Sequence, residues 1–201
     1  YNDVVKAVTE NLDKIGIGIA LSNLYDFIWE NFCDWYIELV KPRLFDKENP
    51  TGKTAQYVLT YVLSNTMKLL HPFMPFITEE IWQHLPHEGE SIMISEWPEY
   101  DEKLNFPKDV ESMELIMQSI SAIRNRRAEM NVPPSKKAKV IIVTDKTDVF
   151  KQGTAFFEKL ASASEAVVQT DKSGISDNAV NVVVPSAEVF LPLDELVDKT
   201  K

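Results

Sequence analysis

Cysteine is almost absent from this sequence, which has one, Cys33, among 201 residues. A single thiol excludes an internal disulfide and any zinc site built on paired cysteines, and it fits a reducing, cytoplasmic compartment. Histidine is also scarce, with three copies. No GxSxG motif and no spaced Cys and His pair occurs. The sequence therefore predicts no catalytic residues and no metal site.

Long apolar runs are missing as well. No stretch approaches the roughly 18 consecutive apolar residues of a membrane span, and the N-terminus lacks the layout of a signal peptide. No membrane partner is expected. With 44% apolar residues the chain is long enough for one large domain or two small ones. It begins at Tyr1 rather than Met and ends in DELVDKTK without a helix-stopping residue, as expected for a piece of a longer chain.

Helical periodicity dominates the first two thirds of the chain, beginning with VVKAVTENL. Apolar residues at steps of three and four predict helices over 15–41, 54–70, 76–85 and 108–130. Pro42 is expected to end the first of these, and the polar segment 86–106 is expected to be a long loop. The expected inward faces are Leu21, Leu24, Ile28, Phe32, Trp35 and Leu39; Tyr57, Val58, Tyr61, Val62, Met67 and Leu70; Ile77, Ile81, Trp82 and Leu85; and Met113, Ile116, Met117, Ile120 and Ile123.

The pattern changes after Pro133 and Pro134, which disfavour a helix beyond Val132. Short β-branched runs at 139–144, 166–169, 181–185 and 187–193 predict strands, with a helix over 146–162. We therefore expect an α+β fold, in which a mainly helical bundle over 1–132 precedes a small α/β unit over 133–201.

Four carboxylates, Asp26, Glu30, Asp34 and Glu38, follow one another at steps of four. Such a row can hold metal in a helical bundle, but di-metal bundles also use Glu-x-x-His pairs, which are missing here. A solvated helix face is the favoured interpretation, and metal-dependent hydrolysis is the alternative. TGKT at 51–54 lacks both the upstream glycine and the preceding strand of a phosphate-binding loop.

Basic residues concentrate in one window of an acidic chain. Residues 121–140 carry a net charge of +5, whereas the whole chain carries −10. Two interpretations stand side by side. Cations at a helix C-terminus complement its dipole, and arginines with nearby lysines can also bind RNA phosphates. The basic side chains in the window are Arg124, Arg126, Arg127, Lys136, Lys137 and Lys139.

The stretch LLHPFMPFITEEIW at 69–82 combines two prolines with helical spacing. We expect Pro72 to end one helix and Pro75 to begin the next, with Phe73, Met74 and Phe76 filling the corner. The same stretch resembles the anticodon-binding helical domains of the class I synthetases for valine, leucine and isoleucine. Three further segments, LYDFIWENFCDWYIELVKPRL (24–44), ESIMISEWPE (90–99) and RNRRAEMNVPPSKKAKVIIV (124–143), resemble the bacterial valyl-tRNA synthetases, in order and over nearly the whole chain.

This resemblance implies the C-terminal anticodon-binding region of an enzyme that joins valine to its tRNA with ATP. The HIGH and KMSKS signatures of the ATP site are missing, so the fragment itself is expected to be inactive and to hold no cofactor. The implied partners are valine tRNA and the catalytic and editing domains of the same chain, in a monomer; a domain-packing module without RNA contact is the alternative. The residues expected to hold tRNA or the domain junction are Arg124 and Arg127, followed by Lys136, Lys137, Lys41 and Arg43.

Overall fold

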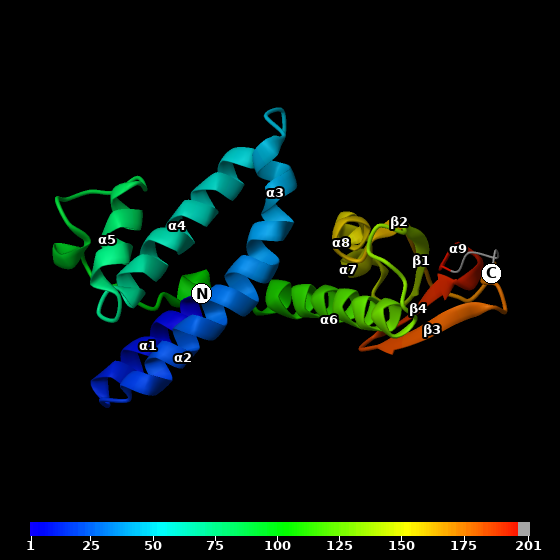
Figure 1. Cartoon of the computed structure of the whole chain (residues 1–201), viewed down its shortest axis with the longest axis horizontal. Coiled ribbons are helices and arrows are strands. Elements are labelled where there is room, and N and C mark those ends of the chain that lie inside the picture. Colours follow the sequence, from blue (N-terminus) through cyan, green and yellow to red (C-terminus); the bar gives the residue numbers. More distant parts are fainter. Residues whose placement is uncertain (197–201) are drawn as a thin grey trace. The chain divides into compact units, whose positions relative to one another are not determined.

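The computed structural model describes residues 1–196 and divides into two compact units, Tyr1–Asn105 and the chain from Phe106 onward (Figure 1). Helices build the first unit, and a helix-backed sheet builds the second, so the expected α+β fold is confirmed. None of the helices in the described part has the length and apolar character needed to cross a membrane. The units are considered one at a time below.

The first unit is a bundle of amphipathic helices. Its core contains Val5, Val8, Ala20, Leu24 and Leu69, with a neighbouring cluster of Met67, Trp82 and Ile92. The predicted loop over 86–106 is confirmed apart from two single 3₁₀ turns, and Trp97 ties it to the first helix by donating to Thr9 Oγ1 at 2.9 Å. The elements are α1 (Asn2–Asp13), α2 (Ile17–Asp26), η1 (Phe27–Ile37), α3 (Glu38–Phe45), α4 (Gly52–Leu70), α5 (Pro75–Gln83), η2 (Ile92–Ile94) and η3 (Glu102–Leu104).

The element η1 is a π-helix of eleven residues between α2 and α3. Its hydrogen bonds span five residues rather than four, so side chains five apart share a face. Phe27 and Phe32 are accordingly both buried. Leu21, on the preceding α2, is exposed. The α-helical stripe predicted over 15–41 was therefore wrong in part. The carboxylate row also drifts around the helix, and no group of three or more potential metal ligands occurs within residues 1–196.

Two further details of the helical prediction were wrong. The helix does not end at Pro42 but continues to Phe45, because the fixed φ of proline is itself helical and only one N–H donor is lost. On α4, Tyr57, Val58 and Tyr61 are exposed, while Ala55, Thr66, Met67 and Leu69 are buried. The elements α2, α3 and α5 pack most extensively against α4, and they leave part of its apolar surface uncovered.

The proline-rich elbow between α4 and α5 has the predicted ends, with Pro75 in the first turn of α5. Its packing differs from the prediction. Phe73 packs on the core, but Met74 and Phe76 are exposed. Hydrogen bonds of buried Thr78 fix the corner instead, since its hydroxyl donates to the Met74 carbonyl at 2.8 Å and lies 2.8 Å from His71 Nδ1.

The second unit is a four-stranded sheet in the order β2-β1-β4-β3, in which β1 and β2 are parallel and the other pairs antiparallel. All four predicted strands are confirmed. The predicted helix over 146–162 is broken at Gly153, where an added Cβ would approach Ile116 Cδ1 to 2.8 Å. The elements are α6 (Pro107–Glu129), β1 (Ala138–Val143), α7 (Thr147–Gln152), α8 (Thr154–Leu160), β2 (Ala163–Gln169), β3 (Ala179–Val184), β4 (Ala187–Pro192) and α9 (Leu193–Leu196).

Helix α6 belongs to this second compact unit, where it contacts β3 and α7. It buries Ile116, Ile120 and Ile123, as its sequence predicts, and it ends at Glu129. The domain boundary inferred from the two prolines, after residue 132, stays a prediction about the intact protein. Its C-terminal part carries the three arginines of the basic window, with Arg126 and Arg127 in the last turn.

Candidate RNA-binding surfaces

Arg124 lies on the exposed side of α6, and its side chain is engaged with the neighbouring helix. Its Nε donates to the carbonyl of Leu160 at 2.6 Å, at the last residue of α8. This contact holds the end of α8 against α6. The guanidinium still reaches solvent, so Arg124 combines a packing contact with an exposed positive charge.

Arg127, one turn later, points inward and is 4% exposed. Its NH2 group donates to the carbonyls of Pro133, at 3.3 Å, and Lys136. Burial lowers the pKa of the guanidinium. Its NH1 group has no hydrogen-bond partner in the described part of the chain. Arg127 therefore fastens the Pro133–Lys136 loop to the end of α6, across a turn in which Asn131 has a φ of 56°.

The remaining basic side chains of the window surround this fastened loop. Lys136 is half-buried and Lys137 is exposed. Arg126 pairs with Glu129 at 2.9 Å and Lys139 pairs with Glu165 at 3.2 Å, both at the surface. The structure thus brings the window together around one turn, although several of its charges already have acidic neighbours.

Lys41 and Arg43 lie on α3 in the first unit. Lys41 pairs with Glu38 in the same helix. Arg43 donates from Nε to Thr51 Oγ1 at 2.9 Å and from NH2 to the Thr51 carbonyl at 3.2 Å. Arg43 therefore bridges the α3–α4 turn, and TGKT is the start of α4 rather than a phosphate-binding loop.

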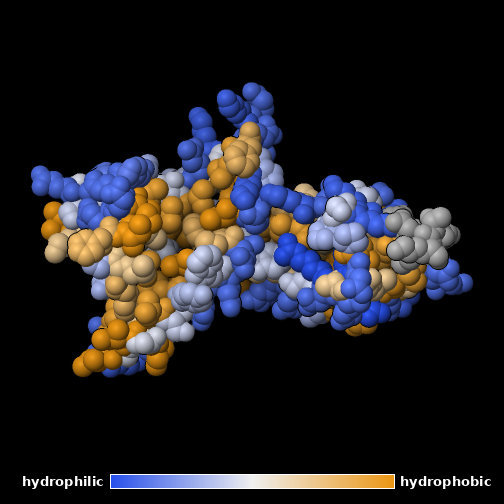
Figure 2. Space-filling model, viewed as in Figure 1, coloured by the Kyte–Doolittle hydropathy of each residue, from blue (hydrophilic) through white to orange (hydrophobic). Residues whose placement is uncertain are grey.

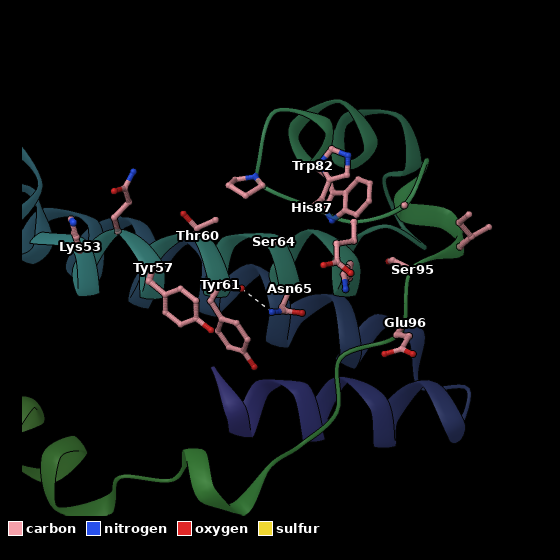
Figure 3. Close-up of a pocket in the computed structure, with 16 residues that line it drawn as sticks. Lys53, Tyr57, Thr60, Tyr61, Ser64, Asn65, Trp82, His87, Ser95 and Glu96 are labelled. Atoms are coloured by element: carbon pink, nitrogen blue, oxygen red, sulfur yellow. Dashed lines mark hydrogen bonds between the residues drawn. The ribbon is translucent and has the colours of Figure 1, made fainter.

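A groove of about 800 Å³ lies between α4 and the 86–96 loop, and sequence reasoning did not find it. Tyr57 and Tyr61 stack on its α4 side, with ring centroids 6.3 Å apart and an interplanar angle of 19°. Trp82 and His87 meet at 4.0 Å on the loop side (Figure 3). Periodicity assigned both tyrosines to the core. Helical spacing identifies a face, but not whether another element covers it.

Charge is distributed unevenly around this groove. Helix α4 carries two lysines, Lys53 and Lys68, and no carboxylate. Both lysines line the groove, while Glu88 and Glu96 line it from the loop. The α4 side thus carries the positive charges of the groove, one lysine near each end of the helix. Figure 2 shows the mixture of hydrophobic and hydrophilic surface on this unit.

Glu79 on α5 anchors the loop wall of the groove. Its Oε2 accepts hydrogen bonds from Ser91 Oγ at 2.7 Å and from the Ile92 amide at 3.2 Å, and its Oε1 accepts one from Gln83 Nε2 at 2.7 Å. These bonds favour the carboxylate and lower the pKa of Glu79, the largest cause being the Gln83 amide. The anchor is thus fully present above the usual glutamate pKa and is lost as the pH falls through the lower folded value.

We expect Glu79→Ala to speed hydrogen exchange of the Ile92 amide, because that N–H loses its acceptor. The check is exchange mass spectrometry at neutral pH on peptides that cover residues 86–96. Glu80→Ala is the matched control, since Glu80 lies next to Glu79 and its carboxylate pairs with His84 at the surface. Equal protection in both variants would show that Glu79 does not hold the loop.

The comparisons with known proteins identify the family. Residues 1–142 match the family model described as the anticodon-binding domain of tRNA ligase. The whole chain is 51% identical to a valine–tRNA ligase of Clostridium perfringens and 48% identical to that of Clostridium acetobutylicum, and 98% of it is 44% identical to that of Bacillus thuringiensis. The chain spans 23% of the length of each of these relatives. The chain belongs to the family of anticodon-binding domains of tRNA ligases.

Proposed function

We propose that this chain is the tRNA-recognition part of a cytoplasmic valine–tRNA ligase, an enzyme that attaches valine to its tRNA with ATP. The observation that carries the proposal is the 44–51% identity to valine–tRNA ligases along essentially the whole chain, together with the family match. In this role the chain positions tRNA: contacts to phosphates fix the register, and unpaired bases are read by stacking and edge contacts.

The catalytic and editing domains and the ATP site then lie in other parts of the intact enzyme. Apolar side chains on the first unit support a packing role toward them. Ile15, Ile17 and Ile19, at the turn between α1 and α2, are all exposed. Three exposed isoleucines within five residues of the chain fit a protein interface. The chain therefore has surface both for the rest of the enzyme and for RNA.

The proposal predicts that the intact enzyme depends on the anticodon. Replacing the anticodon in a valine tRNA transcript should lower kcat/KM for valine attachment by at least about tenfold, which corresponds to about 1.4 kcal/mol of lost transition-state binding. Aminoacylation kinetics with the intact enzyme check this. A transcript with the same number of changes outside the anticodon loop, in a paired stem that keeps its base pairs, is the control.

Equal kcat/KM for both transcripts would contradict anticodon recognition. It would favour the alternative, in which this region joins domains of the synthetase without touching RNA. The two functions also differ in salt dependence. When log K for tRNA binding is plotted against log salt concentration, each contact to a phosphate of single-stranded RNA adds about 0.7 to the magnitude of the slope. A packing module without RNA contact adds nothing.

A further inference from the structure

One face of α4 presents a regular series of side chains to the groove. Each member has another member three or four residues away, so together they line one side of the helix over about 22 Å at 1.5 Å per residue. A lysine stands at each end and the two tyrosines lie between them. The groove-lining residues on this face are Lys53, Gln56, Tyr57, Thr60, Tyr61, Ser64, Asn65 and Lys68.

The two tyrosines form a stack that is open at one end. Tyr57 is 71% exposed, and its ring packs on Tyr61, while Tyr61 in turn meets the edge of Tyr1 at 6.0 Å. A further planar ring can therefore add to the outer face of Tyr57. Lys53 is one helical turn before Tyr57 on the same face, so its ammonium group can pair with an anionic group of a ligand whose ring stacks there.

A buried hydrogen-bond donor lines the same groove. Trp82 is 2% exposed, and its indole N–H has no hydrogen-bond partner within residues 1–196. Buried N–H groups are nearly always paired, so this one indicates an acceptor supplied from outside the described chain. The exposed imidazole of His87 lies against the indole, in the loop anchored by Glu79.

We propose that this α4 groove binds unpaired nucleotides of the tRNA anticodon loop, with a base stacked on Tyr57 and the backbone phosphates along Lys53 and Lys68. The inference rests on the proposed function and names the side chains that perform it. Base–aromatic stacking tolerates any base, so Tyr57 supplies affinity. Gln56, Thr60 and Ser64 line the same groove, and their amide and hydroxyl groups supply hydrogen-bonding partners for base edges.

The chemistry of the groove favours RNA over a protein helix as the occupant. A docked amphipathic helix needs an apolar stripe, whereas this face alternates aromatic rings with amides, hydroxyls and lysines. Glu88 and Glu96 on the opposite wall repel phosphates, which keeps the RNA backbone on the α4 side. Their carboxylates accept hydrogen bonds from the amino groups of bases.

The test uses the intact enzyme and a valine tRNA transcript with 2-aminopurine at an unpaired anticodon position. Stacking on Tyr57 should quench the fluorescence when the parent enzyme binds. Tyr57→Ala should abolish most of this quenching and weaken tRNA binding by roughly 5- to 150-fold, the range for loss of one stacked base. Tyr57→Phe, which keeps the ring, should behave like the parent.

Tyr25→Ala is the matched control, because Tyr25 is also an exposed tyrosine of the first unit and lies outside the groove. It should leave quenching and affinity unchanged. Parental quenching and affinity in a folded Tyr57→Ala enzyme would overturn the inference and leave tRNA recognition to other residues. A different result would contradict the proposed function itself: the parent enzyme would attach valine to the anticodon-replaced transcript with unchanged kcat/KM.

Discussion

Replacing Trp82 by Ala is expected to lower the free energy of unfolding of the helical unit by about 3–5 kcal/mol, the range for large aromatic side chains removed from a core. Trp82 is among the largest fully buried side chains of the molecule. It joins Met67 of α4, Ile92 of the loop and α5 in one cluster. Its loss therefore removes a contact shared by three segments and leaves a cavity between them.

Hydrogen exchange of the α5 amides in the intact protein measures this effect, because it reports the opening of one region even where several domains unfold separately. Trp29→Ala is the matched control, since Trp29 is 53% exposed on η1 and should change stability by no more than about 0.5 kcal/mol. Trp82→Phe should lower the protection of the α5 amides by an amount between those of Trp82→Ala and Trp29→Ala. Equal protection of α5 in the two alanine variants would show that Trp82 does not hold the cluster together.

The sequence predicted the elements well because local rules determine them. Pro75 begins α5, the Pro133–Pro134 pair follows the end of α6, and β-branched runs form all four strands. The failures have physical causes that periodicity does not contain. The π-helix of η1 changes which residues share a face, so Phe27 is buried where the α-helical stripe predicted Ile28. The break at Gly153 depends on contact with Ile116, a residue of another helix.

The candidate site was less predictable than the fold. The sequence located the cations of the basic window but not the direction in which each one points. Arg124 and Arg127 are three residues apart, yet one is exposed and the other is buried against carbonyl groups. The sequence did not predict the α4 groove, because the spacing of its tyrosines assigned them to the core. Tyr57 and Tyr61 have the spacing of core residues, and only the arrangement of the neighbouring helices leaves them exposed.

The second large effect concerns Arg127. Arg127→Ala should destabilise the Pro133–Lys136 loop and the adjoining end of β1 by about 1.5–3 kcal/mol, since it removes hydrogen bonds from a charged donor to two backbone carbonyls. Hydrogen exchange over residues 130–140 measures the loss. Arg127→Lys should recover only part of it, because an ammonium group cannot reproduce the planar geometry of the guanidinium.

The salt dependence of tRNA binding by the same variants separates positioning from direct contact. If Arg127 acts by holding the loop, Arg127→Ala weakens tRNA binding while Lys137 still contacts a phosphate. The magnitude of the slope of log K against log salt concentration then falls by much less than about 0.7. Lys137→Ala should show the reverse, with normal loop protection and a slope reduced by about 0.7. Arg126→Ala is the matched control, because Arg126 is the exposed neighbour of Arg127 and pairs with Glu129 at the surface, so loop protection should be unchanged. A full 0.7 decrease in Arg127→Ala with normal loop protection would instead assign Arg127 to the RNA, despite its burial.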